Sequence, residues 1–179
     1  MLPSFIRNIF TKAEPGPVDF SFAGTDIHSH MIPGIDDGAA TIEDSIELVK
    51  GLYQLGFKKI VTTPHITADM YKNSPEIIKE GLIKLREMIA VNGIPVQIEA
   101  AAEYYFDRDF LQKLDEEKLL TFGDNYLLFE ISYINYPENL EATVFKMQTL
   151  GYRPVLAHPE RYPFWLGRLE EYRKLKDRG

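Results

Sequence analysis

The chain has 179 residues, of which 45% are hydrophobic and 26% are charged, and this composition suits one folded domain with a sizeable core. The formal net charge of -7 argues against a nucleic-acid backbone as the main partner, because phosphate backbones attract basic surfaces. The absence of cysteine excludes a cysteine nucleophile, and no apolar run approaches the roughly 18 residues that a membrane-spanning helix needs.

The first residues of the chain, 1–10, hold a few apolar side chains interrupted by proline, arginine and asparagine. They lack the apolar region and cleavage site of a secretory signal peptide, so we interpret them as a short amphipathic arm. Residues 14–17, Glu-Pro-Gly-Pro, are typical of a turn or linker. We therefore expect an arm and linker over residues 1–19, one folded domain over residues 20–179, and a cytoplasmic location.

Strand and helix patterns alternate through the rest of the chain. Thr41-Ile-Glu-Asp44 resembles a capping box, and Ser74 precedes a proline at the first helical position, so both sites predict helix starts. The predicted strands are residues 20–28, 58–63, 94–101, 125–131 and 153–157. The predicted helices are residues 42–56, 75–92, 109–119, 137–150 and 167–177.

The fold predicted from this alternation is α/β, with a parallel sheet and right-handed crossovers. Periodicity alone leaves open whether the sheet is flat or curls into a barrel. Several polar residues fall at or just past the ends of different strands, and the loops of an α/β barrel all open onto one rim. An open sheet uses a single crevice instead. We therefore predict a TIM-like barrel from the residues that gather at this rim: His28, His30, His65, Glu103 and His158.

The first candidate site is the sequence Asp26-Ile-His28-Ser-His30. Residues i and i+2 of a strand point to the same face, so the two imidazoles should lie side by side and suit the capture of one divalent ion. Asp26 shares that face and is placed to orient a ligand. Taken alone, a His-x-His pair is more often a surface or hydrogen-bonded pair than a metal site.

Two adjacent carboxylates follow in the glycine-punctuated loop of residues 33–38. Asp37 is predicted to curl back over the end of the strand as a hard oxygen ligand. For Asp36 a solvated turn is an equal alternative, because aspartate is a common turn residue.

Three further candidates end other strands. His65 follows Pro64, which stops the second strand, and His158 follows the fifth strand in the same way. Glu103 follows a short apolar run and is predicted to bridge two ions, because a buried carboxylate without a cation is costly. The competing interpretations are a loop histidine for His65 and a simple exposed acid for Glu103.

Arg161 lies three residues after His158, and its planar guanidinium suits two phosphoryl oxygens. The alternative is a surface ion pair with Glu160 or Asp177. Glu130 and Glu160 are further acids at the rim without an assigned role. Trp165 and its aromatic neighbours are expected to pack rather than to cover the site.

Four stretches together resemble the bacterial PHP-type protein-tyrosine phosphatases of capsular and exopolysaccharide loci: residues 26–39, 63–65, 102–105 and 156–162. The resemblance runs in order from about residue 24 to the end of the chain, and its first and last stretches are distinctive. It implies a distorted TIM-like (β/α)7 PHP barrel, of which about five βα units are present here. It also implies two to three divalent ions, manganese first, with iron, magnesium or zinc as alternatives.

The resemblance assigns residue roles as well. It implies a catalytic role for Arg161, which binds the phosphate, and for Asp37. The metal ligands that it implies are His28, His30, Asp37, His65, Glu103 and His158. The implied substrate is a phosphotyrosine cluster on the tail of a cognate tyrosine autokinase that governs polysaccharide export.

One departure from the family pattern lies after His158. The family continues with further strands and an Asp-x-His that supplies two more ligands, whereas this sequence has no such motif there. We expect either a fragment of a longer protein or a shortened form whose barrel does not close, with exposed strand edges that favour homo-oligomers.

The mechanism predicted from these residues is direct hydrolysis by metal-activated water, since clustered cations lower the pKa of a water toward roughly 7. One rival function is a PHP phosphoesterase for a small-molecule phosphate such as a histidinol phosphate, or a nuclease, which the acidic charge disfavours. The other rival is a metal-binding but inactive regulatory domain. No nucleic-acid partner and no direct membrane insertion are expected.

Overall fold

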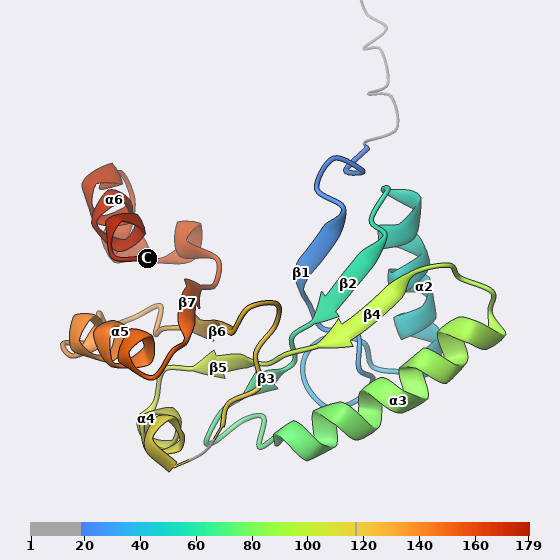
Figure 1. Cartoon of the computed structure of the whole chain (residues 1–179), viewed down its shortest axis with the longest axis horizontal. Coiled ribbons are helices and arrows are strands. Elements are labelled where there is room, and N and C mark those ends of the chain that lie inside the picture. Colours follow the sequence, from blue (N-terminus) through green and yellow to red (C-terminus); the bar gives the residue numbers. More distant parts are fainter. Residues whose placement is uncertain (1–18, 117) are drawn as a thin grey trace, which may run out of the picture.

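The structure is a computed structural model, and it describes residues 19–116 and 118–179 (Figure 1). The predicted N-terminal arm and nearly all of its linker lie outside the described residues. The described chain is a mixed α/β fold whose strand ladders are all parallel. The expected strand–helix alternation is therefore present, and it is the arrangement of the strands that differs from the prediction.

The strands of the described residues form two sheets rather than one. The first has the order β1-β2-β4, built from β1 (Thr25–Ser29), β2 (Lys59–Thr62) and β4 (Gln97–Ala100). The second has the order β3-β5-β6-β7, built from β3 (His65–Ile66), β5 (Glu103–Tyr105), β6 (Tyr126–Glu130) and β7 (Arg153–Leu156).

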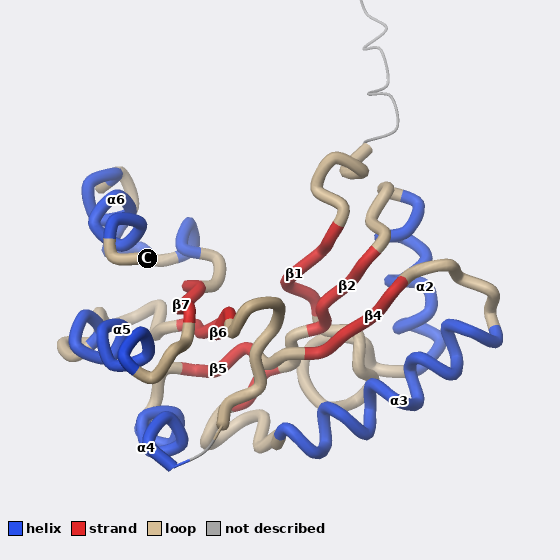
Figure 2. Tube along the Cα trace, in the orientation of Figure 1, coloured by secondary structure: helices blue, strands red, loops and turns tan. Residues whose placement is uncertain are grey.

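Two of the predicted strands correspond to β2 and β4, and each is followed by a short strand of the second sheet that was not predicted. Figure 2 shows β2 and β4 running toward β3 and β5, with a short connection between the two members of each pair. In the first pair the break falls at Pro64, which cannot donate a backbone hydrogen bond. In the second it falls at Ala101 and Ala102, which are fully buried where the chain passes from one sheet to the other. The strands thus change direction at the level of the candidate site.

The predicted TIM-like barrel is not confirmed by this topology. Among the described residues, the ladders leave β1 at one end of the first sheet, and β3 and β7 at the two ends of the second. In the part of the chain that the structure describes, no ladder between these end strands closes the sheets. What the structure establishes is the coarser prediction of an α/β fold with parallel sheets.

Within residues 19–116 and 118–179, five α-helices flank the sheets. Figure 1 shows α2 (Ile42–Gln54) and α3 (Pro75–Val91) beside the three-stranded sheet. The other three lie around the four-stranded sheet: α4 (Arg108–Glu116), α5 (Leu140–Thr149) and α6 (Leu169–Asp177). None of the described helices is both long and apolar enough to cross a bilayer.

The helix starts agree with the capping signals. The Thr41 hydroxyl accepts from the Asp44 backbone N–H at 3.1 Å, and the Asp44 carboxylate accepts from the Thr41 N–H at 3.0 Å. Ser74 is the N-cap of α3. The buried residues of α3 are the helically spaced set expected from the sequence: Ile78, Leu82, Leu85 and Ile89.

The last predicted helix begins later than expected. Two 3-10 turns, η1 (Pro159–Arg161) and η2 (Pro163–Trp165), precede it, and each starts at a proline. Tyr162 and Trp165 are 0% and 4% exposed and pack edge to face with ring centroids 5.5 Å apart. The expectation that these aromatic residues pack is confirmed.

Candidate metal centre

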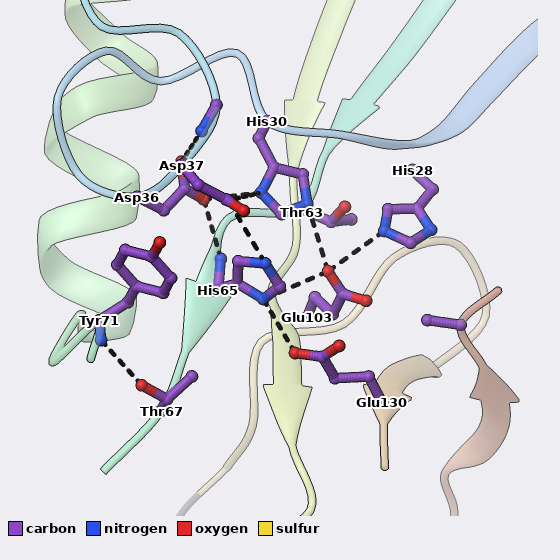
Figure 3. Close-up of polar contacts among 12 residues, drawn as sticks. His28, His30, Asp36, Asp37, Thr63, His65, Thr67, Tyr71, Glu103 and Glu130 are labelled. Carbon is purple, nitrogen blue, oxygen red and sulfur yellow. Dashed lines mark hydrogen bonds and ion pairs between the residues drawn. The ribbon is translucent and has the colours of Figure 1, made fainter. Parts of the chain in front are cut away.

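The candidate residues come together at the place where the two sheets meet. His28 lies on β1 and His30 just past it, while His65 and Glu103 are the first residues of β3 and β5. His65 and Glu103 are also direct partners in the parallel ladder. Figure 3 shows these side chains pointing toward one another. The predicted convergence of separate strand ends on one point is therefore present.

Glu103 is at the centre of the group, with 1% of its surface exposed. Its Oε2 lies 3.2 Å from Nε2 of His28, 3.2 Å from Nε2 of His30 and 3.3 Å from Nδ1 of His65. Its Oε1 lies 3.0 Å from Nε2 of His158. Burial acts to raise the pKa of Glu103, but the imidazole hydrogen bonds outweigh it and hold the pKa well below its usual range. One buried carboxylate thus joins all the histidines of the chain.

The chain on both sides of His30 is held by Thr62 of β2. The buried Thr62 hydroxyl donates to the Ser29 carbonyl at 3.0 Å and accepts from the Met31 N–H at 2.8 Å. The imidazoles of His28 and His30 stack with centroids 5.7 Å apart, so the predicted side-by-side pair is confirmed.

His158 reaches the cluster through an unusual backbone conformation. Its φ is 29°, in the left-handed region that non-glycine residues rarely adopt. Such backbone costs on the order of 1–3 kcal/mol and concentrates at functional sites. The His158 side chain is 8% exposed and lies within reach of Glu103 and Glu130.

Glu130 belongs to this group, although the sequence reasoning gave it no role. It is 7% exposed, with Oε1 3.3 Å from Nδ1 of His65 and Oε2 3.5 Å from Nε2 of His158. A signal was present in the sequence, because Glu130 ends the apolar strand β6 much as Glu103 follows an apolar run.

The two neighbouring aspartates have different environments. The Asp37 side chain is 61% exposed, with Oδ1 3.5 Å from Nε2 of His65 and 3.7 Å from Nδ1 of His30. The Asp36 side chain is 0% exposed and lies 2.8 Å from Nδ1 of His30. The interpretation of Asp36 as a solvated turn residue is therefore wrong, because its carboxylate is enclosed by donors.

Charge within the cluster follows from these contacts. Burial acts to lower the pKa of His30, but hydrogen bonds to Asp36 and Glu103 raise it to about 9. Burial also opposes the shift at His65, where Glu130 and Glu103 raise the pKa. The neighbouring carboxylates therefore favour the protonated forms of His30 and His65.

Asp26 does not play the orienting role expected of it. Its Oδ2 is buried and has no hydrogen-bond partner among the described residues. The hydrogen-bond partner of His30 is Asp36 instead.

The donor set fits divalent cations. Nδ1 of His65 is buried without a well-formed hydrogen bond, even though carboxylate oxygens of Glu103 and Glu130 lie 3.3 Å away. Nitrogen and oxygen atoms that lie this close together without hydrogen bonding to one another are suited to bind one shared ion. Imidazole and carboxylate groups are suitable ligands for first-row divalent metals. Three groups have their ligand atoms within 4.8 Å of one another: His28, His30 and Glu103; His30, Asp37 and His65; and His65, Glu103 and Glu130.

A cavity of about 970 Å³ opens onto this group, with Arg161 at its lining. The Arg161 side chain is 63% exposed, and its Nε lies 3.7 Å from Oε1 of Glu160. The weak surface ion pair with Glu160 is therefore present, and Arg161 also lines the cavity. Tyr71 stacks on His65 with centroids 5.4 Å apart, and Tyr133 stacks on His158 at 5.7 Å. Histidines and carboxylates therefore form the floor of the cavity, and aromatic rings form its sides.

Known proteins resemble this chain in sequence. A profile of the family described as "Capsular polysaccharide synthesis, CpsB/CapC" matches residues 24–179. Tyrosine-protein phosphatase YwqE of Bacillus subtilis is 34% identical over 137 residues, which cover 76% of this chain and 54% of YwqE. Tyrosine-protein phosphatase CpsB of Streptococcus pneumoniae is 32% identical over 155 residues, covering 86% of this chain and 64% of CpsB.

The fold also resembles a solved one. A chain from the crystal structures of YwqE and CpsB, described as "unique metal-dependent tyrosine phosphatases", superimposes with a TM-score of 0.80 at 31% identity. The match covers 87% of this chain and 63% of that chain. The present chain thus spans between about half and two thirds of the length of these relatives.

Proposed function

Because this chain belongs to the CpsB/CapC family of capsular polysaccharide synthesis, we propose that it is a metal-dependent tyrosine phosphatase. The observation that carries the proposal is the meeting of all four histidines around the buried Glu103 at the floor of one cavity. The two relatives named above are tyrosine-protein phosphatases and the related solved structure is described as metal-dependent, which supports the same activity here.

We further propose that residues 20–179 belong to a PHP-type domain. The parallel ladders of the two sheets and the TM-score of 0.80 to a related phosphatase support this assignment. In this proposal the sheets are parts of a distorted TIM-like barrel, whose loops open onto the same rim as the cavity.

The cluster would hold two or three divalent ions, with manganese expected first and iron, magnesium or zinc as alternatives. Bound there, a cation supplies Lewis acidity, which lowers the pKa of a water and offsets negative charge on the phosphoryl group. The proposed ligands are His28, His30, Asp37, His65, Glu103, Glu130 and His158.

The remaining roles fall to residues at the cavity. We assign Arg161 to binding two phosphoryl oxygens, because its guanidinium is exposed at the lining of the cavity and its planar geometry suits a bidentate contact. Asp37 is the most exposed of the clustered carboxylates, and besides binding metal it can accept a proton from the attacking water. The chain has no cysteine, so attack on phosphorus cannot pass through a cysteinyl phosphate.

The proposed substrate is phosphotyrosine on the tail of a cognate tyrosine autokinase in polysaccharide export. The family description supports the capsule setting. The aromatic sides of the cavity support an aryl ester, because Tyr71 and Tyr133 offer ring faces or edges to a substrate ring.

The test is phosphate release by the purified chain with Mn²⁺ from a phosphotyrosine peptide, a phosphoserine peptide and a sugar phosphate. We expect the phosphotyrosine peptide to be preferred, with activity lost in chelator and restored by Mn²⁺. Turnover that resists the chelator would contradict the proposal. Preference for the sugar phosphate would favour a small-molecule phosphoesterase, and metal binding without turnover would favour a regulatory domain.

A further inference from the structure

We propose that Asp36 is a positioning residue for the metal centre, which orients the His30 imidazole and fastens the loop that carries Asp37 to strand β3. This inference rests on the proposed metal site. It extends that site to a residue that lies behind the ligands and holds them in place.

The Asp36 carboxylate uses both of its oxygens. Oδ2 accepts from Nδ1 of His30 at 2.8 Å and from the backbone N–H of His65 at 3.0 Å, and Oδ1 accepts from the Gly38 N–H at 3.0 Å. Its side chain is 0% exposed. Figure 3 shows Asp36 between the two imidazoles and the loop. A buried carboxylate with three donors is fixed in position, and so are the groups that donate to it.

The contact to His65 occurs at an open edge of the second sheet. Among the strands that the structure describes, β3 is an end strand that pairs only with β5, so the backbone groups of His65 on its other side face no described strand. Side chains take that place. Asp36 accepts from the His65 N–H, while Asn73 Nδ2 donates to the His65 carbonyl at 2.8 Å and to the Ile35 carbonyl at 2.9 Å. Asp36 and Asn73 thus join the loop after β1 to β3.

The contact to His30 determines which ring nitrogen faces the cluster. With Nδ1–H donating to Asp36, the other nitrogen, Nε2, faces Glu103 at 3.2 Å and is the atom available to an ion. A carboxylate on the far nitrogen of a metal-binding imidazole fixes its tautomer and raises its basicity. Asp36 therefore acts on His30 and on the position of His65 at once.

The loop has little freedom to find another arrangement. A Cβ at Gly38 would lie 2.3 Å from the His30 Cβ, so the loop passes directly against His30 and only glycine fits there. The Ala39 N–H donates to the His30 carbonyl at 3.1 Å, which closes the loop. This conformation of the loop places Asp37 next to His30 and His65.

The experiment compares Asp36→Ala and the nearly isosteric Asp36→Asn with two controls. Asn73→Ala removes the other side chain at the edge of β3 without touching the His30 ring. Asp69→Asn changes an exposed acid of the cavity that is not in the cluster. For each, the affinity for Mn²⁺ is measured by calorimetry with chelator competition. The His30 tautomer is read from ¹⁵N NMR of the Zn²⁺-loaded protein.

We expect Asp36→Ala to lower Mn²⁺ affinity by about 10- to 100-fold and to populate the His30 tautomer protonated at Nε2. Asp36→Asn should lose less, because its amide oxygen can still accept from His30. Asn73→Ala should lose less than Asp36→Ala and keep the His30 tautomer, and Asp69→Asn should match the unaltered chain.

Normal Mn²⁺ affinity in both Asp36 variants would overturn the inference, as would equal losses in Asp36→Ala and Asn73→Ala with an unchanged tautomer. An unaltered chain that binds no Mn²⁺ would overturn it as well. Failure of the proposed function appears differently, as metal binding without phosphotyrosine hydrolysis, so the two results are distinguishable.

Discussion

Oε1 of Glu103 lies 3.0 Å from Nε2 of His158, although strand β6 separates β5 from β7 in the sheet. Two strand spacings amount to roughly 9–10 Å, so both side chains must lean over the end of β6 to meet. Glu130 is the last residue of β6, and its Oε2 lies 3.5 Å from Nε2 of His158. Carboxylates from two neighbouring strands therefore both lie close to His65 and His158.

Glu103→Gln is expected to have the largest effect on metal binding. It keeps the size of the side chain but removes the charge that faces all four imidazoles, so Mn²⁺ affinity should fall by more than about 100-fold, beyond the loss from an outer partner. Calorimetry measures this, and Glu99→Gln is the control, because Glu99 is on β4 and pairs with Lys59 at the surface. An unchanged Mn²⁺ affinity would show that Glu103 is structural only.

Glu130→Gln tests the residue that the sequence reasoning left out. Because Glu130 completes the group with His65 and Glu103, we expect fewer Mn²⁺ ions per chain by elemental analysis and a loss of phosphotyrosine hydrolysis. Glu160→Gln alters an exposed acid that also lines the cavity and should retain the metal content. Full metal content in Glu130→Gln would remove Glu130 from the proposed ligands.

Arg161→Ala separates phosphate binding from metal binding. Loss of hydrogen bonds to a charged phosphoryl group costs about 1.5–3 kcal/mol, which corresponds to about 10- to 100-fold in kcat/KM for a phosphotyrosine peptide. Metal content should not change. Arg161→Lys should recover only part of the loss, because a lysine has no bidentate geometry. Equal activity in Arg161→Ala and the unaltered chain would favour the surface ion pair with Glu160.

Tyr71→Leu tests the aromatic side of the cavity. An aromatic contact is worth about 0.5–1.5 kcal/mol, so the preference for a phosphotyrosine over a phosphoserine peptide should fall by about 2- to 10-fold. Tyr71→Phe keeps the ring and should keep the preference. Should both variants behave alike, the ring of Tyr71 does not contact the substrate.

The stability of the chelator-treated protein should depend on pH through His30. Its pKa is raised from 6.5 to about 9 in the folded state, so its contribution is fully present below pH 6.5 and is lost as pH rises through 9. The raised pKa of His65 acts in the same direction. We expect the free energy of unfolding to fall between pH 6.5 and 9 in urea titrations. His30→Asn should flatten this dependence, and a rise over the same interval would contradict the assignment.

The sequence by itself determined the local features of this protein. The capping residues Thr41 and Ser74, and the helically spaced residues that α3 buries, depend on contacts within a few positions of the chain, so periodicity and capping rules predict them. The histidines could also be placed at strand ends, because hydrophobic runs stop just before them.

Only the tertiary structure decided how those strand ends face one another. The short strands β3 and β5 in a second sheet, the burial of the Asp36 side chain, the inclusion of Glu130 and the lack of a hydrogen-bond partner for Oδ2 of Asp26 among the described residues were not predicted. Each depends on where the chain bends at Pro64 and between Ala101 and Ala102, and on which carboxylate a distant imidazole then meets. Local propensity carries no information on contacts between residues such as Glu103 and His158, which lie 55 positions apart.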